Sequence, residues 1–263
     1  MFKKTDEFRK EALRYMEDGV YTRALPGTKD YYEYWDDQRH KCIYGYTVGE
    51  TTITGNHYFY LNFCPIDRSV EEVLPDGTIL AKRERTFPAF YDGDFKYFTA
   101  IDQCRKSNRH MTVLKARRKG YSYKAAAMLA RNYFHIRNSK NYVFAGQKEY
   151  LIEEAGAFPG FLKAWEVAMP TMRQGANTLG TMVAFGTGGT EGADFEGMEE
   201  LFYNPDSYDC LAFENVWDAG ARGTYCGHFV PIYENLEGFI DKDGNSNMDK
   251  AVAFEEENRV KKK

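Results

Sequence analysis

Cationic and small residues between Thr112 and Tyr123 could bind phosphate groups. The apolar segment 111–114 predicts a strand, and a basic stretch that ends at Gly120 follows it directly. Gly120 allows a tight backbone approach, and Ser122 stands where the next helix should begin, so its hydroxyl could ligate Mg²⁺. The candidate phosphate-binding residues are Lys115, Ala116, Arg117, Arg118, Lys119, Gly120, Tyr121, Ser122 and Tyr123.

This segment departs from the standard GxxxxGK[ST] phosphate-loop pattern. No glycine lies five residues before Gly120, and Tyr121 occupies the usual lysine position. On pattern alone, a basic turn that caps a helix is an equally good interpretation.

A nucleotide hydrolase also needs one carboxylate for the metal shell and a second to activate water. Glu153 could serve the metal and Glu154 the water, although adjacent glutamates are also common on solvated helix faces. The apolar run before them is short, so we expect a segment to be missing near 150/151, by deletion or by renumbering. Glu214, which follows an apolar pair, is a rival acidic candidate.

These features resemble the ATPase domain of large terminase subunits, the DNA-packaging motors of tailed bacteriophages. In similar loops the phosphate lysine stands at the start, here Lys115, and the loop ends in Gly-Tyr-Ser, here residues 120–122. The resemblance implies a γ-phosphate arginine, which is Arg117 or Arg118, and a catalytic Glu154. It also implies a coupling motif at the end of a strand over 181–185, at Gly186, Thr187 and Gly188.

The resemblance extends over roughly residues 30–250 and sets further expectations. It implies adenine contacts at Tyr91, Asp92 and Gly93, with ATP and Mg²⁺ as cofactors. It implies double-stranded DNA, a portal protein and a small terminase subunit as partners of a homo-oligomeric ring. It also implies that the protein acts in the host cytoplasm, at the procapsid portal. Nuclease activity is not expected, because the acidic cluster of the terminase nuclease domain is missing. A scaffold or DNA-binding module that has lost hydrolysis is the alternative function.

The elements that must position these residues follow from hydrophobic periodicity. Helices are predicted over 6–18, 91–106 and 124–136, and strands and turns over 31–62, with one turn at Gly55-Asn56. Strands are predicted at 111–114, 142–145 and 181–185. A strand–loop–helix–strand order implies a parallel sheet. We therefore expect an α/β, P-loop NTPase-like fold with a mainly parallel central sheet flanked by helices, made of a helical segment 1–30 and an ATPase domain 31–263.

Composition restricts the class of protein further. The net charge of −4 does not favour nucleic-acid binding by the chain as a whole, so any DNA contact must come from local basic patches. Five scattered cysteines without CxxC spacing predict reduced thiols rather than a zinc site. No signal peptide is recognisable, and no apolar run approaches the ~18 residues of a membrane span.

Overall fold

The computed structural model describes residues 1–73, 79–117, 119–141, 160–174, 177–178, 180–187 and 193–261. The chain divides into two compact units. The first comprises Met1–Phe95, Ala126–Lys140 and Lys242–Asn245, and the second comprises Lys96–Ala125, Asn141–Asp241 and Ser246–Lys263. The predicted boundary at 30/31 therefore falls inside the first unit. Two helices, α4 (Asp92–Lys106) and α5 (Tyr121–His135), run from one unit into the other.

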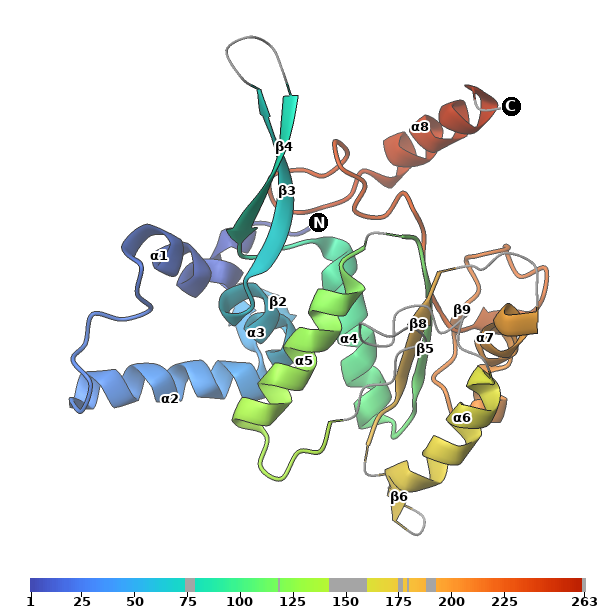
Figure 1. Cartoon of the computed structure of the whole chain (residues 1–263), viewed down its shortest axis with the longest axis horizontal. Coiled ribbons are helices and arrows are strands. Elements are labelled where there is room, and N and C mark those ends of the chain that lie inside the picture. Colours follow the sequence, from blue (N-terminus) through green and yellow to red (C-terminus); the bar gives the residue numbers. More distant parts are fainter. Residues whose placement is uncertain are drawn as a thin grey trace. The chain divides into compact units, whose positions relative to one another are not determined.

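Helices and two antiparallel hairpins form the first unit (Figure 1). Besides parts of α4 and α5, its elements are η1 (Thr5–Arg9), α1 (Lys10–Asp18), α2 (Lys29–Tyr44), β1 (Tyr46–Val48), β2 (Thr51–Ile53), α3 (Gly55–Phe63), β3 (Ile66–Val73) and β4 (Ile79–Thr86).

The expectation of strands over 31–62 is wrong outside the β1–β2 hairpin. Two threonines explain the helices found there: the Thr28 hydroxyl accepts a hydrogen bond from the Tyr31 N–H, and the Thr54 hydroxyl accepts one from the His57 N–H. Each satisfies an N–H that a helix start leaves without a partner. Gly55-Asn56 is the first step of α3 rather than a turn. Residues 55–62 are all buried, so an aromatic-rich sequence suits this central helix.

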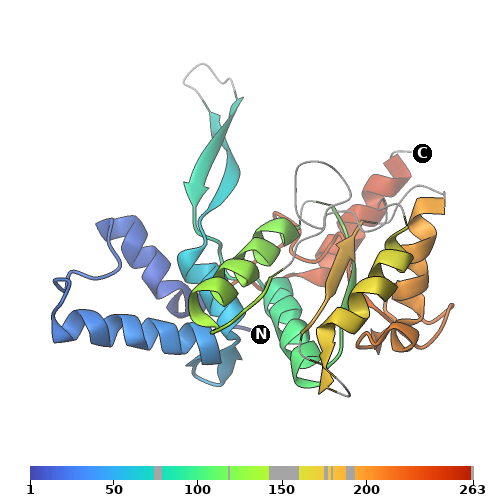
Figure 2. The same cartoon turned by 60° about the horizontal axis from the view of Figure 1, so that its bottom comes forward.

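A long two-stranded ribbon, β3 with β4, projects from the rest of the first unit (Figures 1 and 2). At its base, Asp67 lies opposite Arg85 and Arg68 lies opposite Glu84. Opposite charges facing each other across an antiparallel pair are favourable. Charged residues on a strand edge also discourage pairing with other chains.

The second unit is built on a parallel sheet with the strand order β11-β5-β8. Besides parts of α4 and α5, its elements are β5 (Met111–Lys115), α6 (Phe161–Ala168), η3 (Met169–Met172), β6 (Arg173–Gln174), β7 (Asn177–Thr178), β8 (Val183–Gly186), α7 (Ala193–Tyr203), η4 (Pro205–Tyr208), β9 (Phe213–Glu214), β10 (Tyr225–Cys226), β11 (His228–Val230) and α8 (Met248–Lys261). The expected mixed α/β class and parallel sheet are confirmed. The central strand β5 is buried along its whole length, as strands covered on both faces are.

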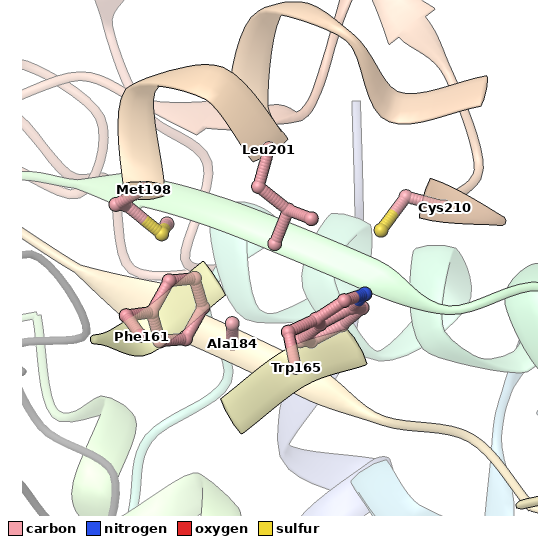
Figure 3. Packing of buried hydrophobic residues seen from close by; sticks show 6 residues of the cluster. All are labelled: Phe161, Trp165, Ala184, Met198, Leu201 and Cys210. Carbon is pink, nitrogen blue, oxygen red and sulfur yellow. The ribbon is translucent and has the colours of Figure 1, made fainter. Parts of the chain in front are cut away.

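One face of this sheet is covered by α6 and α7. Phe161 and Trp165 of α6 pack with Met198 and Leu201 of α7 over Ala184 of β8 (Figure 3). Thr112 of the central strand points to the same side, since its hydroxyl lies 3.7 Å from the Met198 sulfur. Strand side chains alternate, so Val113 and Lys115 point to the opposite face.

Several expected elements are confirmed. Helix 6–18 appears as η1 and α1, helix 91–106 as α4, and helix 124–136 as α5 with an earlier start. Strands 111–114 and 181–185 appear as β5 and β8. The expected strand 142–145 lies outside the described residues. Across the described ranges, no helix is long and apolar enough to span a membrane.

Candidate functional site

The carboxyl ends of the three parallel strands meet at one edge of the sheet. β5 ends at Lys115, which pairs with Val230 at the end of β11. On the other side, Leu114 pairs with Gly186 at the end of β8. Ligands of open α/β sheets bind outside this edge. Among the described residues, the chain that follows the three strands supplies 116–117, 119–120, Thr187 and 231–234.

Lys115 is a buried cation at this edge. Its side chain is on the sheet face opposite α7, and the residue is 6% exposed. The Ala116 N–H donates to the Val230 carbonyl at 3.0 Å, so the chain stays in register one residue beyond the strand. The Lys115 ammonium lies 5.8 Å from the centre of the Tyr121 ring. Buried charge is costly unless other groups stabilise it, and an aromatic face or a bound anion can do so.

Gly120 and the start of α5 form the next part of the edge. Gly120 has φ +68°, in the left-handed region, and no described atom lies within 4 Å of the place where a Cβ would be. The Lys124 N–H donates to the Gly120 carbonyl, so the helical bonds begin here. The first-turn N–H groups of a helix are directed at its N-terminus, where anions bind. Ser122 lies in that first turn and is half-buried.

Tyr121 belongs to the core. It is 2% exposed, and its ring centre lies 4.5 Å from that of Tyr97 and 5.9 Å from that of Phe185. The position that holds lysine in the standard pattern therefore holds a packing residue. Only its main chain can face a phosphate at this edge.

Two further lysines bind main-chain carbonyls. The Lys119 ammonium donates to the carbonyl of Ile232 at 2.7 Å and to that of Glu234. The Lys124 ammonium donates to the carbonyl of Lys119 at 2.7 Å and lies 4.4 Å from the centre of the Tyr121 ring. Both positive charges lie at the predicted loop, but both ammonium groups have protein acceptors.

Glu234 is a buried carboxylate that the sequence interpretation missed. It lies four residues beyond the end of β11, and its Oε1 is 2.5 Å from the Lys96 ammonium. The signal in the sequence was an acid shortly after an apolar strand. That signal was assigned instead to Glu214, which is exposed on the short strand β9.

The other predicted site residues divide into two groups. Within the described ranges, Arg117 is exposed in the loop, Gly186 is buried at the end of β8, and Thr187 follows it half-buried. Arg118, Glu153, Glu154, Gly188 and the suspected break near 150/151 lie outside the described residues.

The predicted adenine contacts belong to the first unit, whereas the loop belongs to the second. The Asp92 N–H donates to the Gly244 carbonyl at 2.9 Å, and the Asp92 carboxylate accepts from the Gly93 N–H at 2.8 Å. These bonds fix the start of α4. They give Asp92 a structural role of its own.

The described part of the chain holds no group of three His, Cys, Asp or Glu side chains that could bind a metal ion. At the loop, the described residue whose hydroxyl oxygen could bind a cation is Ser122. The second predicted ligand, Glu153, lies outside the described residues. The described residues thus bring a buried lysine and the first-turn N–H groups of α5 to this edge, and a site for Mg²⁺ would also need Glu153.

Two histidines, the buried His110 and the half-buried His228, make the second unit sensitive to acid. Burial, helped by Arg173, lowers the pKa of His110 to about 4, and burial, helped by Lys96, lowers the pKa of His228 to about 4. The unfolded chain therefore takes up these protons at a higher pH than the folded chain does. Stability present above pH 6.5 should be lost as the pH falls toward 4, by roughly 1 kcal/mol per pH unit for each imidazole.

Melting temperatures between pH 7 and pH 5 test this prediction. His110→Gln and His228→Gln should each flatten the fall, whereas His40→Gln, at an exposed histidine, should leave it unchanged. A melting temperature that falls equally with pH in the unaltered chain and in all three variants would contradict the prediction.

Comparison with protein-family models, with curated proteins and with solved structures gave no match for this chain. Its function is therefore argued from the site alone.

Proposed function

We propose that this chain binds ATP at the carboxyl edge of its parallel sheet and hydrolyses it with Mg²⁺. The observation that carries the proposal is the sequence of β5, loop and α5. A central buried strand ends in a buried lysine, a left-handed glycine follows, and a helix starts with its N-terminus at the same edge. Backbone N–H groups, a helix N-terminus and a cation are the parts that a phosphate loop combines.

In this proposal Lys115 and the first-turn N–H groups of α5 bind the phosphates. Ser122 and Glu153 would hold Mg²⁺, which when bound neutralises charge on the phosphate oxygens. Glu154 would orient and deprotonate the attacking water, and Arg117 or Arg118 would stabilise charge on the γ-phosphate. Thr187, at the end of the neighbouring strand, would connect hydrolysis to movement.

The work that such hydrolysis would drive is the packaging of double-stranded DNA. The resemblance of the loop to that of large terminase subunits supports this part of the proposal. The partners would be the portal protein and the small terminase subunit, with several copies of the chain acting as a ring in the host cytoplasm.

A nucleotide-binding or DNA-binding scaffold without turnover is the second candidate. The observation that favours it is the engagement of Lys119 and Lys124 with carbonyl groups. That engagement leaves the loop with fewer cations directed at a transferring phosphoryl group than its sequence indicates.

Calorimetric titration of the whole chain with ATP, with and without Mg²⁺, tests the proposal. We expect a Kd below about 1 mM that tightens with Mg²⁺, and much weaker binding of adenosine. No heat at millimolar ATP would reject nucleotide binding altogether. ATP binding without phosphate release, in the presence of double-stranded DNA, would favour the scaffold.

A further inference from the structure

Lys119 is fixed by hydrogen bonds at two places, its side-chain ammonium group and its main-chain carbonyl. The side chain reaches the carbonyls that follow β11, at Ile232 and Glu234. The carbonyl accepts a hydrogen bond from the Lys124 ammonium, which is buried at 4% exposure. The first contact spans 113 residues of sequence and the second spans five.

The second contact fixes the direction of the next amide. In a trans peptide the C=O of one residue and the N–H of the next point in opposite directions. Since the Lys119 carbonyl points inward to a buried ammonium, the Gly120 N–H points away from it. Gly120 itself is not crowded, since no described atom lies within 4 Å of a Cβ placed on it. An outward N–H just before a helix start is the kind of donor that phosphate loops use.

We propose that Lys124 is a positioning residue of the phosphate loop, which presets the Gly120 N–H toward the phosphate by binding the Lys119 carbonyl. Lys119 supports the same arrangement through its side chain. The inference rests on the proposed function and deepens it, because it assigns two of the basic residues to loop geometry. Lys115 is then the lysine that meets the phosphate. A donor held in place before binding lowers the ordering cost of the ligand.

One peptide group can be observed selectively to test this. Lys119-Gly120 is the only Lys-Gly pair in the sequence. Labelling with ¹³C-carbonyl lysine and ¹⁵N-glycine therefore gives a single ¹³C–¹⁵N correlated signal, which reports the carbonyl of Lys119 and the amide of Gly120 together. The measurement is made on the whole chain, with and without ATP.

Lys124→Met removes the donor and keeps an apolar side chain against the Tyr121 ring, so we expect the fold to persist. The carbonyl signal should shift already in the ATP-free protein, and ATP affinity should fall about tenfold, as for one hydrogen bond to a charged group. Lys119→Met removes the labelled carbonyl and with it the signal, so only its ATP affinity is compared, and that affinity should fall less than in Lys124→Met. Lys106→Met, at an exposed lysine paired with Asp102, is the matched control and should change neither quantity.

The outcomes separate three cases. If ATP fails to bind the unaltered chain, the proposed function fails, and this inference with it. If that chain binds ATP and Lys124→Met binds it equally well, only the inference is wrong. If Lys124→Met loses affinity while the ATP-free carbonyl signal stays unchanged, Lys124 contacts the phosphate directly, which also overturns the positioning role. Melting temperatures of all variants show whether any loss comes from unfolding instead.

Discussion

Replacing Lys115 by methionine should lower ATP affinity by a factor of about 100 or more. Methionine keeps the buried, unbranched stem and removes only the ammonium group. Loss of one partner of a buried charge pair costs about 2–5 kcal/mol, and each 1.4 kcal/mol is a factor of ten. The variant also loses the contact of the ammonium group with the Tyr121 ring, so its stability without ATP is measured as well. Calorimetric titration and thermal melting measure the two effects separately.

The matched control for Lys115→Met is Lys106→Met, the same chemical change at a side chain that is 78% exposed. We expect the control to bind ATP as the unaltered chain does. ATP affinity that is equal in the Lys115 variant and in the control would remove Lys115 from the site. The proposed phosphate loop would then lack the lysine that the resemblance to terminases places at its start.

Asn62→Ala should lower the free energy of unfolding by about 3–5 kcal/mol. The Asn62 side-chain amide is fully buried, and both its oxygen and its nitrogen make hydrogen bonds. Its oxygen accepts from the N–H groups of Glu11 and Ala12, and its nitrogen donates to the carbonyls of Phe8 and Tyr58. These are all four bonds that an amide side chain can make. Alanine would leave buried backbone groups of η1 and α1 without acceptors or donors.

Urea denaturation of the whole chain measures this loss. Asn204→Ala is the control, because Asn204 is exposed and its amide donates a single 3.3 Å bond. A change below about 1 kcal/mol for Asn62→Ala would contradict the structural role of the amide. It would mean that water satisfies the groups that Asn62 leaves.

The local elements around the loop could be predicted because their signals are local. β5 is a short apolar run, and α5 carries a series of alanines after Gly120, which favours a helix. A strand, a glycine and a helix in this order predict a parallel sheet, and the pairing of β5 with β8 confirms it. The position of Lys115 at the edge follows from the same pattern.

The incorrect and missed predictions have two causes. Some local sequence patterns favour more than one secondary structure, and some contacts form between residues far apart in the sequence. The aromatic residues of 31–62 favour strands, but the threonine caps at Thr28 and Thr54 and burial on all sides favour helices. Glu234 and the acceptors of Lys119 lie more than a hundred residues beyond the loop. Only the pairing of β11 with β5 brings them there, and the short apolar run of β11 does not specify a partner.

The path of the chain has a consequence for synthesis on the ribosome. Residues 242–245 belong to the first unit, where Asn245 exchanges two hydrogen bonds with Phe2 and the Gly244 carbonyl accepts from the Asp92 N–H. The amino-terminal unit is therefore made first but completed late. Until residues 242–245 leave the ribosome, Phe2 and Asp92 lack these acceptors. Early folding of this unit must then proceed without these three hydrogen bonds.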